Sequence, residues 1–124
     1  MKITTFNPMI LSKNADDIIK LFEELGFEKT HAPTVNTGAG MVTSTRMKDA
    51  NGFHIDIADV QSVEKDMTIM RMNVDDFDEA FKMLSEKGFT RNSSGKLVET
   101  ESNKSTLMIS PSGFGIDLCQ HIKN

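Results

Sequence analysis

Two aspartates occupy equivalent places in two similar stretches of the chain, Asn51–Val60 (NGFHIDIADV) and Ser112–His121 (SGFGIDLCQH). Side chains alternate between the faces of a strand, so His54 and Asp56 leave the first stretch on the same side. Asp56 and Asp117 can each bind a cationic group, hold a weakly bound metal ion or act as a general base. A solvated carboxylate in a water-filled groove explains them equally well. The residues alone leave these alternatives open.

His54 and Cys119 are further candidates because each shares a face with one of these carboxylates. His54 and Asp56 form the kind of pair in which a carboxylate orients an imidazole for proton transfer, and a surface or structural histidine is the alternative. Cys119 is the only cysteine, which excludes an intrachain disulfide and a cysteine-rich metal site. Nothing near it in the sequence indicates an activated thiol.

Arg71 lies in the apolar stretch Met67–Val74 (MTIMRMNV). If Met70, Met72 and Val74 face a helix, the opposite face of this strand carries Ile69, Arg71 and Asn73. An arginine there suits a ligand carboxylate or phosphate through its planar pair of donors. An ion pair with Asp56 or Asp117 is the alternative. Met9, Met47 and Met108 either line a pocket or fill the core.

The elements that must position these residues occur twice. Asn14–Phe27 (NADDIIKLFEELGF) and Asp76–Phe89 (DFDEAFKMLSEKGF) match at a separation of 62 (89 − 27). Each predicts an amphipathic helix that begins at an N-cap, Asn14 or Asp76, and ends at a glycine. The predicted apolar faces are Ile18, Leu21, Phe22 and Leu25 in the first helix, and Phe77, Ala80, Phe81 and Leu84 in the second.

Alternation and turn residues place strands around both helices. The predicted strands or extended segments are Ile3–Leu11, Phe27–Val35, Met41–Met47, Phe53–Asp59, Met67–Val74, Phe89–Glu101 around a turn at Ser93–Gly95, Ser105–Ile109 and Phe114–Ile122. Asn36–Gly40 is predicted to be a loop, Lys48–Gly52 and Ser110–Gly113 tight turns, and Gln61–Asp66 the linker. The class is therefore α+β, with two tandem strand–helix–strand–strand–strand modules at residues 1–62 and 63–124 in one domain.

Composition narrows the classes of function. The net charge of −4 argues against a nucleic-acid surface. No apolar stretch approaches the length of a membrane span, and the first residues lack a signal-peptide core, so we expect a cytoplasmic protein.

The duplicated module resembles the vicinal oxygen chelate superfamily, which includes glyoxalase I, extradiol dioxygenases and bleomycin-resistance proteins. The resemblance is carried by Leu21–Glu28 (LFEELGFE), Val74–Phe89 (VDDFDEAFKMLSEKGF) and Ser110–Gln120 (SPSGFGIDLCQ). It implies an incomplete barrel in which the open sheet faces of the two modules enclose a ligand cavity. Residues expected to line this cavity are Asn7, Met9, His54, Asp56, Ile69, Arg71, Asn73, Asp117 and Cys119.

Enzymes of this superfamily usually hold a divalent metal with side chains from the first and last strand of each module. Counted from the helix caps, these positions fall on Asn7, Ile69, Asp56 and Asp117, or on Phe6 and Thr68 if the first strands shift by one. Ile69 has no donor atom and Asn7 is a weak neutral ligand, so the usual metal centre is not expected. If a metal is bound, its expected ligands are Asp56, Asp117 and His54.

The resemblance and these departures predict a small-molecule-binding protein that needs no cofactor. The alternative is a lyase, isomerase or dioxygenase of the same superfamily that uses an oxygen-ligated divalent metal. We expect a homodimer, with the modules paired either within one chain or across a swapped dimer.

Overall fold

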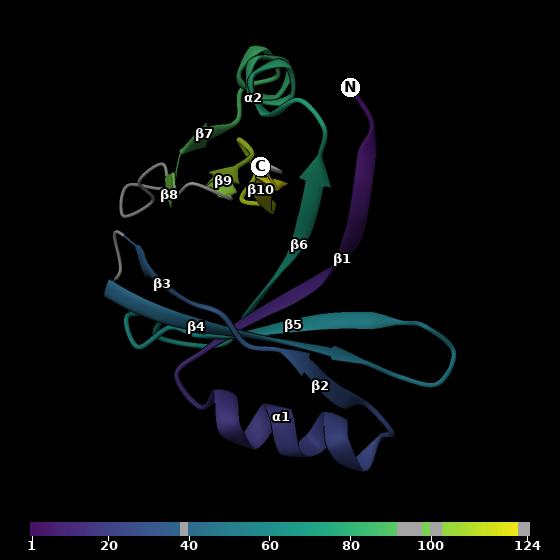
Figure 1. Cartoon of the computed structure of the whole chain (residues 1–124). Helices are drawn as coiled ribbons and strands as arrows, with labels where there is room; N and C mark the ends of the chain where they lie inside the picture. The colour runs from purple at the N-terminus through teal and green to yellow at the C-terminus, as the bar shows by residue number, and fades with distance from the viewer. Residues whose placement is uncertain (38–39, 92–97, 100–102, 122–124) are drawn as a thin grey trace. The chain divides into compact units, whose positions relative to one another are not determined.

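A computed structural model describes residues 1–37, 40–91, 98–99 and 103–121 (Figure 1). The chain forms two compact units. Residues 7–68 make up one, called here the N-terminal unit. Residues 1–6 and 69–124 make up the other, the C-terminal unit. Strand β1 (Ile3–Ser12) contributes its first residues to the C-terminal unit and the remainder to the N-terminal unit.

The N-terminal unit is a sheet with strand order β2-β4-β5-β1 and one helix, α1 (Ala15–Glu24). Its other strands are β2 (Glu28–His31), β4 (Gly40–Lys48) and β5 (His54–Asp59), and the short β3 (Thr34–Thr37) pairs with β4. Strand β1 runs parallel to β5, and β4 runs antiparallel to β5. Helix α1 covers one face of this sheet (Figure 1), where Ile18, Ile19 and Phe22 pack on a core of Ala15, Met47, Ile55 and Ile57.

The C-terminal unit repeats this arrangement. Its sheet order is β1-β6-β10-β9-β7, and the short β8 (Val98–Glu99) pairs with β9. The remaining elements are β6 (Met67–Val74), α2 (Phe77–Glu86), β7 (Thr90–Arg91), β9 (Asn103–Ile109) and β10 (Gly115–His121). Strand β10 is parallel to β6 and antiparallel to β9. Because β7-β9-β10-β6 has the pairing of β2-β4-β5-β1, the structure confirms the α+β class and the duplicated module.

The two helices begin differently although their sequences match. Asp76 caps α2 as predicted, since its Oδ1 accepts a hydrogen bond of 3.1 Å from the backbone N–H of Glu79. Asn14 occupies the predicted N-cap position of α1, but its side chain makes no capping hydrogen bond. Instead, the backbone N–H of Asn14 donates to Ser12 Oγ. Neither helix has the length and apolar character that crossing a membrane requires.

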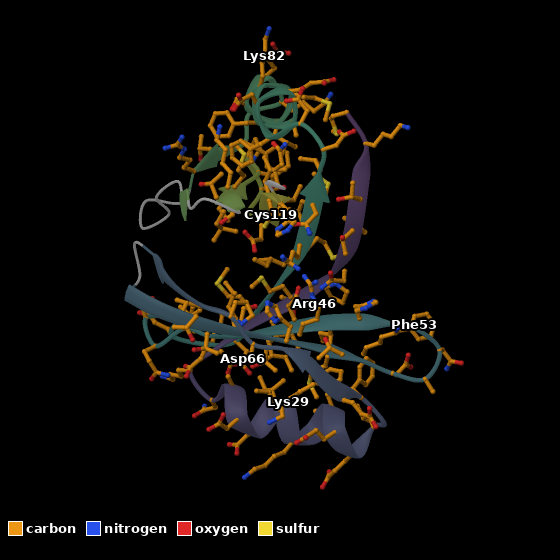
Figure 2. All side chains as sticks on the ribbon, viewed as in Figure 1. Lys29, Arg46, Phe53, Asp66, Lys82 and Cys119 are labelled. Carbon is orange, nitrogen blue, oxygen red and sulfur yellow. The ribbon has the colours of Figure 1, made fainter. Side chains whose placement is uncertain are left out.

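Three further expectations need correction. Leu21 and Leu25 are 50% and 62% exposed, because the buried stripe of α1 runs along Ala15, Ile18, Ile19 and Phe22. Phe53 is the first residue of the predicted strand Phe53–Asp59, but it precedes β5 at the hairpin turn, where it is 65% exposed (Figure 2).

The predicted loop Asn36–Gly40 and the predicted strand Phe27–Val35 also change. Asn36 and Thr37 belong to β3 and Gly40 begins β4, while the extended segment divides into β2 and β3 around Ala32 and Pro33. The predicted turn at 93–95 and the end of the last predicted strand at 122 lie outside the described residues.

Tight turns set the ends of the strands that carry the two aspartates. Gly52 and Gly113 have φ angles of +87° and +101°, a left-handed conformation that glycine adopts without strain. Asp49 Oδ1 accepts hydrogen bonds from the N–H groups of Asn51 and Phe53, which closes the first of these turns before β5 begins. The two similar stretches therefore enter their strands at the same point.

Candidate functional site

The face of the N-terminal sheet opposite α1, called here the helix-free face, carries the predicted carboxylate. Because Ile55 and Ile57 point into the core beneath α1, their neighbours on β5 point the other way. Register across the strands aligns Met9 of β1 with Asp56 of β5 and Asp56 with Arg46 of β4. The helix-free face is formed by Asn7, Met9, Leu11, Ser44, Arg46, Lys48, His54, Asp56 and Ala58.

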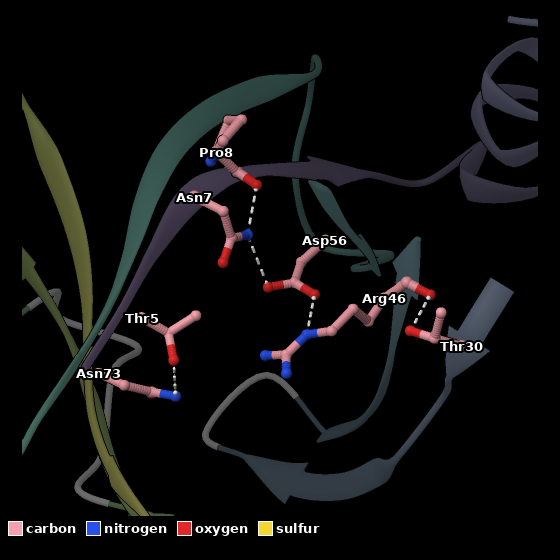
Figure 3. A network of polar contacts seen from close by, with 7 residues as sticks. All are labelled: Thr5, Asn7, Pro8, Thr30, Arg46, Asp56 and Asn73. Atoms are coloured by element: carbon pink, nitrogen blue, oxygen red, sulfur yellow. Dashed lines mark hydrogen bonds and ion pairs between the residues drawn. The ribbon is translucent and has the colours of Figure 1, made fainter. Parts of the chain in front are cut away.

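Asp56 is almost fully buried, with 2% of its surface exposed. Its Oδ1 accepts a hydrogen bond of 3.2 Å from Arg46 Nε, and its Oδ2 accepts one of 3.0 Å from Asn7 Nδ2 (Figure 3). The Arg46 side chain is 27% exposed. A buried carboxylate is strongly unfavourable without such partners, so Arg46 and Asn7 stabilise the charge that the strand places there.

The orientation of the Asn7 amide follows from its neighbours. Nδ2 donates both to Asp56 Oδ2 and, at 2.9 Å, to the carbonyl of Pro8. The reversed amide would place oxygen against these two acceptors, which excludes it. Asn7 Oδ1 is therefore the amide atom that faces neither Asp56 nor the Pro8 carbonyl. It is buried and has no hydrogen-bond partner among the described residues.

The sequence analysis did not identify Arg46. A strand was expected at Met41–Met47, and Met47 was its only side chain considered for a pocket, although the alternation of this strand indicates the face on which Arg46 lies. Met47 and Thr45 are buried beneath α1, so the charged side chain between them must leave on the other face. The antiparallel pairing of β4 with β5 then places Arg46 beside Asp56.

The residues aligned across the strands beside Asp117 in the C-terminal unit carry a different pattern of charges from those beside Asp56. Asp117 is aligned with Arg71 of β6 on one side and Leu107 of β9 on the other. The arginine aligned with Asp117 thus lies on β6, whereas the arginine aligned with Asp56 lies on β4, the counterpart of β9. Within the C-terminal unit, Asn73 Nδ2 donates a hydrogen bond of 3.4 Å to Thr5 Oγ1 (Figure 3). The cavity predicted between the two modules stays a prediction.

The remaining candidate residues lie in several environments. Met47 and Met108 are core residues with no exposed surface, whereas Met9 belongs to the helix-free face and is 7% exposed. His54 is aligned with Lys48 of β4, and no hydrogen bond to Asp56 is found among the described residues. Cys119 is a buried thiol whose Sγ lies 3.7 Å from the carbonyl oxygen of Asp117.

The residues at the expected metal positions do not form a suitable donor set. Ile69 is 3% exposed, and its methyl group fills the space beside Gly115. Asp56 has a guanidinium nitrogen 3.2 Å from its carboxylate, which opposes a second cation there. Within the described residues, no three His, Cys, Asp or Glu side chains are grouped so that they could hold a metal ion. These side chains do not fit the imidazole-rich or carboxylate-rich sites that divalent metals favour.

A separate polar hollow of about 330 Å³ lies at the start of α1. It is lined by Lys13, Asn14, Ala15, Asp16, Asp17, Asp59 and Gln61. Gln61 Nε2 donates to the Lys13 carbonyl and to Asp59 Oδ1, so part of this lining is already engaged. The hollow contains none of the predicted site residues.

Comparison with known proteins identifies the fold. No family model matches the chain, and no curated protein matches it in sequence. A solved methylmalonyl-CoA epimerase is 20% identical, with 94% of each chain covered and a TM-score of 0.65. A methylmalonyl-CoA epimerase from Mycobacterium tuberculosis is 13% identical over 98% of this chain and 90% of that chain, with a TM-score of 0.71.

A third solved structure comes from Vibrio splendidus 12B01 and is described as a glyoxalase/bleomycin resistance protein/dioxygenase superfamily member. It is 13% identical, covers 98% of this chain and 100% of its own, and has a TM-score of 0.62. The chain therefore has the glyoxalase/bleomycin-resistance fold that its sequence predicted. At these identities the likeness concerns the fold alone, because this fold supports unrelated functions.

Proposed function

We propose that this chain binds a small molecule on the helix-free face of its N-terminal unit, using its own side chains in place of a divalent metal. The observation that carries the proposal is the buried Asp56 carboxylate, held by Arg46 and Asn7 on a sheet face that no helix of that unit covers. The other function considered, a metal-dependent lyase, isomerase or dioxygenase, has no comparable support from the donor set.

Stability alone gives little reason for such a network. Replacing a buried ion pair by apolar residues is often neutral or stabilising, so a buried pair contributes little net stability. The other side chains on this face include buried apolar ones, Met9, Leu11 and Ala58, each at most 9% exposed. Apolar residues could therefore also occupy the positions of Asn7, Arg46 and Asp56. A few polar groups converging within an apolar lining are typical of ligand sites.

The polar groups are also arranged for recognition. Asp56 accepts a hydrogen bond from Arg46 at Oδ1 and from Asn7 at Oδ2, and these bonds orient the guanidinium and the amide. Arg46 uses Nε for this contact and remains partly exposed. Asn7 retains an acceptor, Oδ1, that has no hydrogen-bond partner in the part of the chain that the structure describes. The carboxylate therefore acts as a positioning group, and the arginine and asparagine are the groups that meet a ligand.

A thermal-shift screen on protein stripped of metal with a chelator tests the proposal. The screen should contain anionic, neutral and cationic small molecules, each measured with and without Mg²⁺, Mn²⁺, Ni²⁺ and Fe²⁺. We expect at least one class to raise the melting temperature saturably while the chelator is present. A response that appears only after a metal is added would instead support the metal-dependent function.

Assembly as a homodimer belongs to the same proposal. Each unit exposes large apolar side chains, including Phe53 at 65%, and Phe6 and Phe114 at 56% and 50%. These side chains are available to an interface between two copies of the chain. Single exposed apolar residues also occur on monomers, so the assembly has to be measured. Light scattering at several protein concentrations measures the assembly, and a constant monomer mass would contradict it.

A further inference from the structure

The geometry of Arg46 leaves one edge of its guanidinium turned away from Asp56. The ion pair uses Nε, at 3.2 Å from Asp56 Oδ1. In Figure 3 the two terminal nitrogens of Arg46 extend away from the carboxylate. A guanidinium presents parallel N–H groups at this edge, in the spacing that matches the two oxygens of a carboxylate. Because the side chain is 27% exposed, a ligand can reach it.

The amide of Asn7 supplies a second requirement. Its Oδ1 is buried and has no partner among the described residues, while the residue as a whole is 4% exposed. Buried carbonyl oxygens almost always accept a hydrogen bond, because losing water without replacement is unfavourable. The contacts of Nδ2 to Asp56 and Pro8 prevent the amide from turning to relieve this. A group that carries an O–H or N–H donor is therefore needed at Oδ1.

Charge favours one kind of anion over another. Arg46 and Asp56 cancel, so the pair offers a local cationic edge without a net positive charge. The cost of removing an anion from water rises with the square of its charge, whereas its attraction to this pair rises only in proportion to the charge. A ligand with two negative charges, such as a phosphate monoester, is therefore disfavoured relative to a ligand with one. A carboxylate carries a single charge and has the planar shape of the guanidinium edge.

We infer that the ligand of the helix-free face is a small organic acid, whose carboxylate meets the outer edge of Arg46 and whose hydroxyl or N–H group donates to Asn7 Oδ1. This inference rests on the proposed function and specifies its ligand class. Asp56 does not touch the ligand. It fixes the positions of Arg46 and Asn7, so the spacing between the acid group and the donor group determines which acids bind.

A matched series of acids tests this on the full chain in the presence of a chelator. The probes are glycolate, 3-hydroxypropanoate and 4-hydroxybutanoate, compared with acetate, propanoate and butanoate. Two NMR signals report on the site, the Arg46 Nε–H and the Asn7 side-chain amide. We expect one hydroxy acid to shift both signals saturably and to bind about fivefold more tightly than its plain partner, which is the effect of one net hydrogen bond.

Variants assign the two contacts separately. Arg46→Gln should weaken binding of both members of the pair by about tenfold or more, as expected for loss of a charged hydrogen-bonding partner. Arg46→Lys retains the charge without the fork and should give an intermediate affinity, which separates lost recognition from lost folding. Asn7→Ala should bring the fivefold ratio close to one. Arg91→Gln is the control, since Arg91 is an exposed arginine that contacts Phe81 in the C-terminal unit.

The outcomes separate this inference from the proposed function. Equal binding of hydroxy and plain acids, or unchanged binding by Arg46→Gln, overturns the inference. Tighter binding of 3-hydroxypropyl phosphate than of 4-hydroxybutanoate also overturns it, because the anion would then be a phosphate. If a neutral or cationic compound shifts the two signals and no acid does, the inference fails while the proposed function stands. If no compound of any class shifts them, both fail.

Discussion

Removing the guanidinium beside the buried carboxylate is the most informative perturbation of this structure. Arg46→Gln replaces the guanidinium by a neutral amide on a shorter side chain and so removes the positive charge 3.2 Å from Asp56 Oδ1. Asn7 remains as a donor to Oδ2. The variant should fold, because Met47 and Thr45 of the same strand still pack beneath α1.

The expected loss of stability can be estimated from burial. Breaking a fully buried ion pair by removing one partner destabilises a protein by about 3–5 kcal/mol. Asp56 is 2% exposed, but the Arg46 side chain is 27% exposed, so water screens the pair in part. Allowing for this screening and for Asn7, we expect the free energy of unfolding to fall by about 2 kcal/mol. For a chain of this size that corresponds to a melting temperature lower by roughly 6–12 °C.

Urea unfolding of a double-mutant cycle measures the interaction itself. The cycle contains Arg46→Gln, Asp56→Asn and the double variant, and the coupling free energy should be about 1–2 kcal/mol. Asp56→Asn alone should be milder than Arg46→Gln, since water can solvate the partly exposed guanidinium. A loss below about 0.5 kcal/mol for Arg46→Gln, with coupling near zero, would refute the account of how this carboxylate is held.

Three further predictions concern the caps of the two helices, the contact between Gly115 and Ile69, and the pH dependence of stability. Asp76→Ala should destabilise the protein by about 1 kcal/mol through loss of the α2 cap, whereas Asn14→Ala at the equivalent place should change stability by less than about 0.5 kcal/mol; equal effects in urea unfolding would contradict the observed caps. Gly115→Ala should destabilise by about 1–3 kcal/mol because its Cβ would lie 2.6 Å from Ile69 Cγ2, and the same change should have a smaller effect in an Ile69→Ala background; additive effects would argue against this contact. The hydrogen bond to Glu79 raises the pKa of the Met1 ammonium above its ordinary value of 8.0, so this contact stabilises the folded chain below pH 8 and is lost as pH rises through the folded pKa. The stability difference between the parent and Glu79→Gln should therefore be present at pH 7 and shrink above pH 8, and a difference that grows with pH would contradict the assignment.

The repeat made the fold readable from the sequence. The helix cap at Asp76, the left-handed glycines after both helices and the alternation of β5 are local signals, and they hold because neighbouring residues determine them. Asn14 occupies the same N-cap position as Asp76, but its side chain makes no capping hydrogen bond, and its ψ of 44° differs from the 94° of Asp76. Phe53 and Leu21 were misplaced for a related reason. The periodicity of apolar residues predicts that one face of a helix or strand is buried, whereas which residues are at the centre of that face depends on how the element packs against the sheet.

The sequence predicted only part of the site. Alternation placed Asp56 on the face opposite α1, and counting from the helix caps placed Asn7 on the same face. Arg46 was missed although the turn predicted at Lys48–Gly52 joins its strand to β5, because the register that aligns Arg46 with Asp56 depends on the exact form of that turn. The orphaned Oδ1 of Asn7 likewise depends on two partners, one of them 49 positions away. Residues that act through long-range pairing need the structure to reveal them.

The central claim is that Arg46 supplies the cation beside Asp56, at a position where the family resemblance implies a metal ligand. Paramagnetic broadening by Mn²⁺ tests this most directly, since Mn²⁺ is an ion that carboxylate and amide oxygens accept. The Arg46 Nε–H and Asn7 Nδ2 signals should broaden no more than the Arg91 Nε–H signal when one equivalent of Mn²⁺ is added. Selective broadening of the Arg46 and Asn7 signals at substoichiometric Mn²⁺ would contradict the account and make this face a metal centre.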